Sequence, residues 1–115
     1  METFPSILNL RKALSAKTLS SVEITTDYLQ KIQSSDRSIN SFITVDPEKA
    51  LQQAKLADQL IKKGRATAIT GIPIAHKDIF CTQDLTTTCG SRMLEKFIPP
   101  FSATMIENFN NCGAI

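Results

Sequence analysis

Apolar residues recur every three or four positions over much of the first 64 residues, which is the spacing of helices that bury one side. A short first helix is predicted to end near Ala16 or Lys17. A second should begin at Ser20, because Ser20 and Glu23 have the spacing of a capping box, in which each side chain binds a backbone N–H group of the other residue. A serine-rich turn at residues 34–36 should end it. Its predicted buried stripe consists of Val22, Leu29 and Ile32.

A third helix should begin at Asp46, which can cap exposed N–H groups, and Pro47, which has no N–H group to leave unpaired at the first helical position. Gly64 supplies the left-handed residue that ends it. Its apolar face is narrow enough to pack close to a sheet and consists of Ala50, Ala54, Ala57 and Ile61. Before this helix, residues 39–45 predict a short strand or an extended link. The inward residues of that segment would be Phe42 and Val45.

Residues 72–77 alternate in the way that predicts a strand. Ile72, Ile74 and His76 would lie on one face, and Pro73, Ala75 and Lys77 on the other. The strand delivers a charged residue from an apolar interior, so we expect Lys77 to emerge near or under the cover of other residues. A further apolar strand is predicted to start at residues 114–115.

The segment after this strand is polar. Residues 82–91 contain four threonines, one serine and one glycine, with few side chains that can join a core, so they predict a loop. Ser102 is a suitable N-cap for a fourth helix at about residues 103–112, which Gly113 should end. The inward residues of that helix would be Met105, Ile106 and Phe109.

These predicted helices and strands do not close a sheet, because a stable sheet generally needs three or more strands with one face covered. The sequence therefore predicts the α/β fold class, as the opening portion of a larger domain in which helices pack on an incomplete mixed sheet. We expect residues 1–115 to form one fragment of a single domain. It divides into a helical region at about 5–64, the lysine strand and threonine-rich loop at about 70–100, and the last helix.

The composition, with 42% hydrophobic and 21% charged residues, is typical of a soluble globular protein. The apolar runs are too short to cross a bilayer, and the first five residues lack the features of a signal peptide. We therefore expect a cytoplasmic protein with no membrane partner. The net charge of +2 is spread along the chain, so no clustered basic surface for nucleic acid is predicted.

Cys81, Cys89 and Cys112 are odd in number and include no CxxC pair, which fits neither a disulfide framework nor a zinc site. We expect three free thiols. A cysteine nucleophile would need a base beside it, and the single histidine, His76, is expected to be buried.

A lysine at the end of a buried strand can act as a base once it is neutral. Lysine in water has a pKa of about 10.4, and burial can lower that value by several units. The ordinary interpretation of Lys77 followed by an aspartate is a solvated exit from a strand, and the spacing alone favours it over catalysis.

The motif GIPIAHKDIF at residues 71–80, followed by TTCGSRMLEKFIPPFSAT at 87–104, resembles the amidase signature family in sequence and in order. The earlier segments SSVEITTDYLQKI, INSFITVD and EKALQQAKLADQLIKKG are also similar to that family, so the resemblance runs from about Ser20 to the end. Within the family, the sequence looks most like the A subunits of the bacterial amidotransferases that act on glutamyl-tRNA(Gln) or aspartyl-tRNA(Asn).

The resemblance implies an α/β/α fold and a glutaminase that supplies ammonia to correct a misacylated tRNA, with a lysine and two serines as catalytic groups. Lys77 matches the family's lysine, the loop at 87–91 is expected beside the catalytic centre, and both serines are expected after Ile115. The chain alone should then have no activity. The resemblance implies B and C subunits as partners, which use ATP and Mg²⁺ and contact tRNA, while this chain carries no cofactor.

Two positions depart from the family pattern. Asp84 stands where the family usually has glycine, so a positive φ is expected to strain it less than most residues. Ser102 replaces the usual aspartate and should cap equally well. We interpret His76 as a packed or hydrogen-bonded residue that points away from Lys77.

Two alternatives remain open. The chain could belong to another amidase that hydrolyses a different small amide, because the residues that set specificity are expected downstream. It could also be a non-catalytic helical module that docks a partner through the second and third helices. A cooperative thermal transition of the isolated chain would favour this module.

Overall fold

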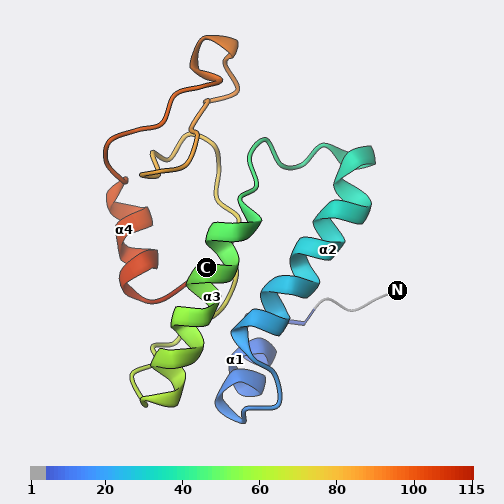
Figure 1. The fold of residues 1–115 in the computed structure, drawn as a ribbon, viewed down its shortest axis with the longest axis vertical. Coiled ribbons are helices and arrows are strands. Elements are labelled where there is room, and N and C mark those ends of the chain that lie inside the picture. The colour runs from blue at the N-terminus through green and yellow to red at the C-terminus, as the bar shows by residue number, and fades with distance from the viewer. Residues whose placement is uncertain (1–4) are drawn as a thin grey trace.

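A computed structural model of the chain describes residues 5–115. The helices are α1 (Ile7–Ser15), α2 (Ser21–Ile39), α3 (Pro47–Lys62) and α4 (Thr104–Asn111), with one 3₁₀ turn, η1 (Arg92–Leu94). Figure 1 shows α2 and α3 side by side, with α1 near the start of α2 and α4 on the other side of α3. A long connection whose one regular element is η1 joins α3 to α4, and residues 5–115 contain no strand.

Local capping signals start α2 and α3 where predicted, and a similar signal starts α1. The Ser6 hydroxyl accepts the Asn9 N–H and starts α1. The Ser20–Glu23 capping box is confirmed: the Ser20 N–H donates to the Glu23 carboxylate at 2.7 Å, and the Glu23 N–H donates to the Ser20 hydroxyl at 3.1 Å. The Asp46 carboxylate caps α3 by accepting the Lys49 N–H at 2.9 Å. Because these bonds join residues three positions apart, the sequence alone determines them.

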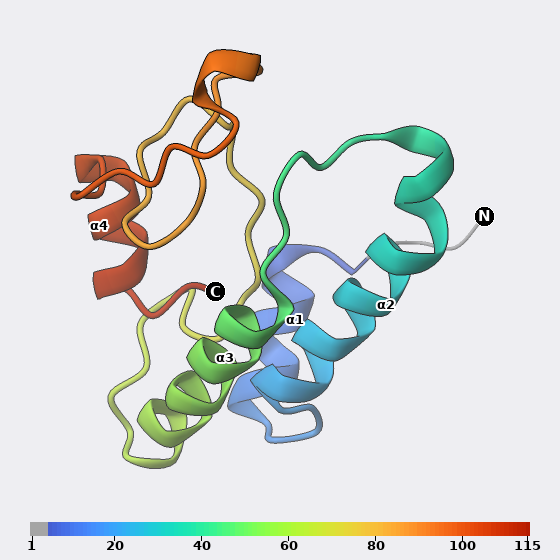
Figure 2. The same cartoon turned by 45° about the horizontal axis from the view of Figure 1, so that its top comes forward.

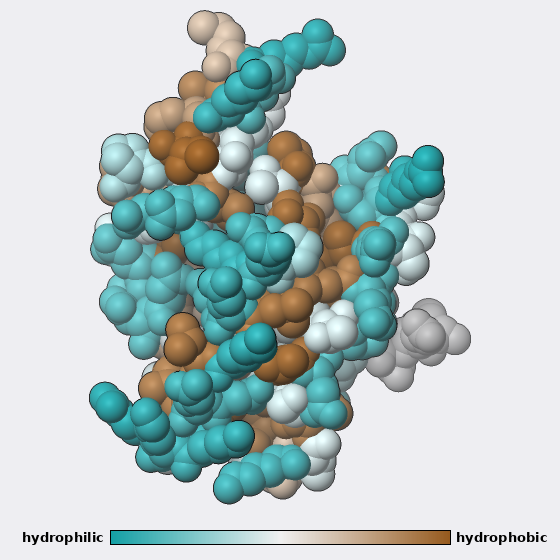
Figure 3. Space-filling model, in the orientation of Figure 1, coloured by the Kyte–Doolittle hydropathy of each residue, from teal (hydrophilic) through white to brown (hydrophobic). Residues whose placement is uncertain are grey.

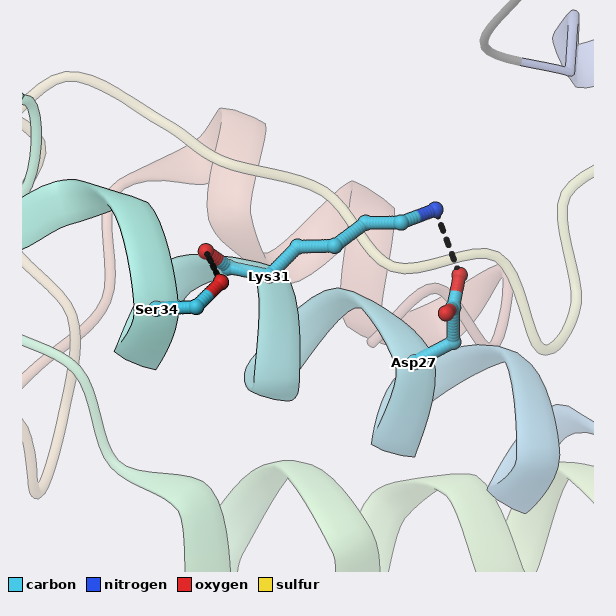
Figure 4. A network of polar contacts seen from close by, with 3 residues as sticks. All are labelled: Asp27, Lys31 and Ser34. Carbon is cyan, nitrogen blue, oxygen red and sulfur yellow. Dashed lines mark hydrogen bonds and ion pairs between the residues drawn. The ribbon is translucent and has the colours of Figure 1, made fainter. Parts of the chain in front are cut away.

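The prediction that residues 34–36 end α2 is wrong, because the helix continues to Ile39. The Ser34 hydroxyl donates to the Lys31 carbonyl at 3.1 Å, so this serine bonds within the helix instead of breaking it. Figure 4 shows this bond beside the ion pair between Lys31 and Asp27, whose nitrogen and oxygen are 2.7 Å apart. Asn40, with a φ of 56°, makes the left-handed stop.

The buried side of α2 also differs from the prediction. Its buried residues are Ser21, Ile24 and Thr25, whereas the predicted stripe of Val22, Leu29 and Ile32 is only half-buried. The main core cluster joins three helical residues to the start of the lysine segment and consists of Leu10, Leu14, Ile24 and Ile72. This core therefore ties α1 and α2 to the segment that carries Lys77.

α3 confirms most of its prediction. Ala54 and Ala57 are buried, and Gly64 adopts a φ of 69° just beyond the helix. The helix packs on α2, and its Asp58 carboxylate accepts the backbone N–H groups of Ser21 and Val22 at 2.7 and 3.2 Å. This carboxylate thus satisfies exposed donors at the start of α2 from 36 residues further along the chain.

The strand predicted at residues 72–77 is extended in the structure without being a strand of a sheet. Its start nevertheless pairs with the chain end: the Ile115 N–H donates to the Ile72 carbonyl at 3.0 Å, and the Ile74 N–H donates to the Ile115 carbonyl at 2.8 Å. In a pair of parallel strands, one residue forms hydrogen bonds with two residues of the neighbouring strand that lie on either side of a third. The predicted stub at residues 114–115 is therefore in contact with the lysine segment, as Figure 2 also shows.

The mixed sheet that we expected is not present in residues 5–115. In the segment at residues 39–45, Ile39 is the last residue of α2 and the rest is a link without regular structure, whose predicted inward residues Phe42 and Val45 are 37% and 40% exposed. With so few extended segments, there is no sheet on which the helices could pack, and the described residues are helical with long loops. The predicted division of the chain into regions stays a prediction.

Ser102 does not cap α4, contrary to the prediction. The N-cap residue is Ala103, and the Ser102 hydroxyl instead accepts the Gln83 N–H at 3.0 Å. Ile106 is buried as expected, Met105 and Phe109 are half-buried, and Gly113 has a φ of 74° after the helix. Ser102 therefore joins the start of α4 to the threonine-rich loop.

Candidate functional site

Lys77 lies at the end of the extended segment, where the Phe80 N–H donates to the Lys77 carbonyl at 3.2 Å and closes a turn. The predicted alternation holds in part: Ile72 is buried and Ile74 and His76 are half-buried, and Ala75 and Lys77 are exposed, but Pro73 is half-buried. The expected cover over Lys77 is thus not supplied by residues 5–115. Its side chain instead lines an open groove of about 910 Å³.

The groove runs between α2, α3, the lysine segment, the threonine-rich loop and α4. Its apolar lining includes Tyr28, Leu29, Ile32, Ile74, Ile106 and Phe109. Figure 3 shows apolar side chains gathered in a band between α2 and α3 on one face of the molecule. The hydroxyl of Thr25, a residue that is only 2% exposed, has no hydrogen-bond partner within residues 5–115. An open groove whose surface is mainly apolar is typical of a surface that binds another molecule or chain segment.

Asp78, next to Lys77, holds the threonine-rich loop in place. The Thr88 N–H donates to one carboxylate oxygen at 2.9 Å, and the Thr88 hydroxyl donates to the other through a short bond. The Cys89 N–H donates to the Asp78 carbonyl at 2.8 Å. These bonds place residues 87–91 beside the lysine segment, where the family resemblance led us to expect them.

Asp78 is ionised more easily than an ordinary aspartate. Burial alone would raise the pKa of its carboxyl group, but hydrogen bonds from Thr88 and from the Gly90 N–H, together with the charge of His76, outweigh it. The net effect lowers the pKa of Asp78. A carboxylate that accepts several hydrogen bonds is stabilised in its charged form.

The loop itself contains left-handed residues that these bonds hold in place. Cys89 and Gly90 both have positive φ, at 52° and 68°, and the Gly90 N–H donates to the Thr88 hydroxyl at 3.1 Å. Asp84 has a φ of 61°, a positive value that aspartate tolerates better than most residues. The ammonium group of Lys49 on α3 donates to the Gln83 carbonyl at 2.9 Å and joins the loop to the helical region.

The interpretation of His76 as a hydrogen-bonded residue is confirmed, although it is half-buried and not part of the core. Its Nε2 lies 3.4 Å from the Thr82 hydroxyl, and its Nδ1 lies 3.4 Å from the Lys77 carbonyl. All three cysteines are free thiols, as expected. Within residues 5–115, no group of three or more His, Cys, Asp or Glu side chains is arranged to hold a metal ion.

The residue that sequence reasoning missed is Asp78. A Lys-Asp pair at the end of a strand is typical of a solvated exit, and the partner of this carboxylate lies ten residues later in a polar loop. The only signal in the sequence was the loop's content of hydroxyl donors, which does not specify which acceptor they bind.

Comparison with known proteins decides the family. Residues 23–115 match the family described as Amidase. The chain belongs to the amidase family. It is 52% identical over 110 residues to the A subunit of the glutamyl-tRNA(Gln) amidotransferase from Coxiella burnetii (strain Dugway 5J108-111), covering 96% of this chain and 23% of that protein. It is 53% identical over 110 residues to the protein of the same name from Methylobacillus flagellatus, covering 96% of this chain and 22% of that protein.

Solved structures agree with this assignment. The peptide amidase from Stenotrophomonas maltophilia matches with a TM-score of 0.90 at 29% identity, covering 96% of this chain and 23% of that one. An amidase family protein from Bacillus anthracis matches with a TM-score of 0.87 at 28% identity, covering 96% and 22%. This amidase chain thus spans less than a quarter of the length of these relatives. No helix in the described part of the chain is long and apolar enough to cross a membrane.

Proposed function

We propose that these residues are the lysine-bearing part of a glutaminase, the A subunit of a glutamyl-tRNA(Gln) or aspartyl-tRNA(Asn) amidotransferase. Identities of 52% and 53% to two proteins named as the glutamyl-tRNA(Gln) form support the proposal. The observation that carries it is the position of Lys77. Its side chain opens into the groove at the start of a turn that Asp78 and the threonine-rich loop fix in place.

Lys77 acts as the general base in this proposal. The neutral amine takes a proton from a first serine, which in turn takes the proton of a second serine as that hydroxyl oxygen bonds to the amide carbon of glutamine. The carbon–nitrogen bond then breaks, ammonia leaves with the proton returned through the same groups, and water hydrolyses the acyl-enzyme to glutamate. Both serines come from protein outside residues 1–115.

The open groove explains how this chemistry fits an exposed lysine. A base must be kept from bulk water to become neutral near pH 7, and the described residues do not cover Lys77. The apolar lining of the groove provides a surface on which the remaining domain can pack. Packing there removes water from the lysine and brings the serines to it.

The partners follow from the same proposal. Ammonia passes to B and C subunits, which use ATP and Mg²⁺ to activate the acylated tRNA and which carry most of the tRNA contacts. The net charge of only +2, spread along this chain, supports that division of labour. A second candidate is another amidase of small amides, which the match to a peptide amidase at a TM-score of 0.90 supports.

The test is a chimera in which residues 1–115 replace the matching segment of the Coxiella burnetii relative, purified with that protein's partner subunits. Ammonia release is measured with glutamine and, separately, with C-terminally amidated peptides. The proposal predicts turnover of glutamine at a rate within about tenfold of the parent, since more than half of the replaced residues are unchanged. Release from peptide amides but not from glutamine would favour the second candidate.

A further inference from the structure

Backbone and side-chain contacts fix the two peptide units that follow Lys77. The Lys77 carbonyl accepts the Phe80 N–H, and the Asp78 carbonyl accepts the Cys89 N–H at 2.8 Å. The Asp78 carboxylate binds both donors of Thr88. Since the direction of a side chain follows from its backbone, these contacts determine where the stem of Lys77 leaves the chain.

Thr88 links this arrangement to the rest of the loop. It is 6% exposed, and its hydroxyl both donates to Asp78 and accepts the Gly90 N–H at 3.1 Å. Its bonds hold Cys89 and Gly90 in left-handed conformations, which cost energy for a residue with a side chain. If the carboxylate were absent, the loop would lose the acceptor that keeps it in this shape.

We propose that Asp78 is a positioning residue for amide hydrolysis, which fixes the backbone of Lys77 and the loop at residues 87–91 relative to each other through Thr88. This inference rests on the proposed function, in which Lys77 is the base. Asp78 itself does not touch the substrate. Its effect comes from orientation, and a displacement of about 1 Å at a reacting group can lower a rate by about a hundredfold.

A carboxylate is required at this position because both of its oxygens are used as acceptors. The amide of asparagine offers one acceptor and one NH₂ donor, so it can accept only one of the two Thr88 bonds in the observed geometry. Asp78→Asn therefore removes one bond while it keeps the size of the side chain. Thr88→Val removes only the hydroxyl, and Thr88→Ser keeps it.

The first measurement is amide hydrogen exchange of the 115-residue chain. Asp78→Asn loses one hydrogen bond and Thr88→Val loses two. In both variants, exchange at the Thr88 and Gly90 amides should become about tenfold faster or more, because the loss of each buried hydrogen bond is of that size. Exchange in α3 should not change. Glu95→Gln, which removes an exposed charge from the same connection, is the matched control and should leave both amides protected.

The second measurement is glutamine hydrolysis by the chimera with its partner subunits. We expect kcat to fall about tenfold or more in Asp78→Asn and Thr88→Val, with KM within about twofold, and Thr88→Ser to restore the rate. Gly64→Ala, which destabilises the chain far from the loop, controls for a general loss of stability and should keep kcat.

The outcomes separate the two proposals. If Lys77→Ala keeps its rate, the proposed function fails. If Lys77→Ala is inactive while Asp78→Asn, Thr88→Val and Thr88→Ser all turn over like the parent, the role of Asp78 is overturned. If Asp78→Asn unfolds, the two Thr88 variants decide. Equal rates in Thr88→Val and Thr88→Ser would contradict the inference. A loss of rate in Thr88→Val but not in Thr88→Ser would support it.

Discussion

Replacing Gly71 by alanine tests the packing that positions the lysine segment. Gly71 has a φ of 81°, and a Cβ atom there would lie 3.0 Å from both Cβ and Oγ of Ser21. Ser21 is fully buried and its hydroxyl donates to the Gly71 carbonyl at 2.9 Å, so it has little room to move. We expect Gly71→Ala to disturb the joint between α2 and the segment that carries Lys77.

The magnitude follows from two terms. A left-handed conformation costs alanine about 1 kcal/mol relative to glycine. Forcing a methyl group into a packed interior costs about 2 kcal/mol more. Gly71→Ala should therefore lower the free energy of unfolding by about 3 kcal/mol, a large share of the roughly 5–15 kcal/mol that is typical of a folded domain.

Gly64→Ala is the matched control. Gly64 also has a positive φ, of 69°, but no atom lies within 4 Å of the position of its Cβ. Only the conformational term of about 1 kcal/mol applies there. Urea unfolding of the two chains, followed by circular dichroism and extrapolated to water, gives the difference. Equal losses in the two variants would refute the claim that Gly71 is packed against Ser21.

Two further predictions concern single polar groups. Thr25→Val should raise the free energy of unfolding by about 1 kcal/mol, because it removes a buried hydroxyl without a partner, whereas Thr26→Val removes one that donates to the Val22 carbonyl and should lower it. A lower free energy of unfolding in Thr25→Val than in the parent, measured by urea unfolding, would contradict this. The pKa of Asp78 is lowered on folding, so its ionised carboxylate adds to the free energy of unfolding. This stability is present above the unfolded pKa of about 3.9 and is lost as pH falls through the folded pKa. When the free energy of unfolding is measured at decreasing pH, Asp78→Asn should therefore lose less stability than the parent. Identical pH dependence in the two chains would contradict this prediction.

The features that the sequence predicted correctly depend on contacts a few residues apart. The capping box at Ser20 and the cap at Asp46 with Pro47 require only local spacing, so the starts of α2 and α3 could be predicted. The positive φ of Asp84 falls where the family usually has glycine, the residue that adopts it most readily.

The features that were missed depend on partners far apart in sequence. Asp58 binds the start of α2, and Asp78 binds Thr88, yet neither carboxylate differs in its sequence context from a solvent-exposed one. The end of α2 was misplaced because serine can either end a helix or bond within it. The burial of the α2 stripe and of Lys77 was overestimated, since the surfaces that would cover them are not formed by residues 5–115.

The central claim is that Lys77 is the base for amide hydrolysis. The most direct measurement is kcat for ammonia release from glutamine by the chimera carrying Lys77→Ala, compared with Lys63→Ala, which removes an exposed lysine just after α3. The account predicts that Lys77→Ala lowers kcat about a hundredfold or more, as expected for loss of a general base, while Lys63→Ala keeps the parent rate. Equal rates in the two variants would contradict it.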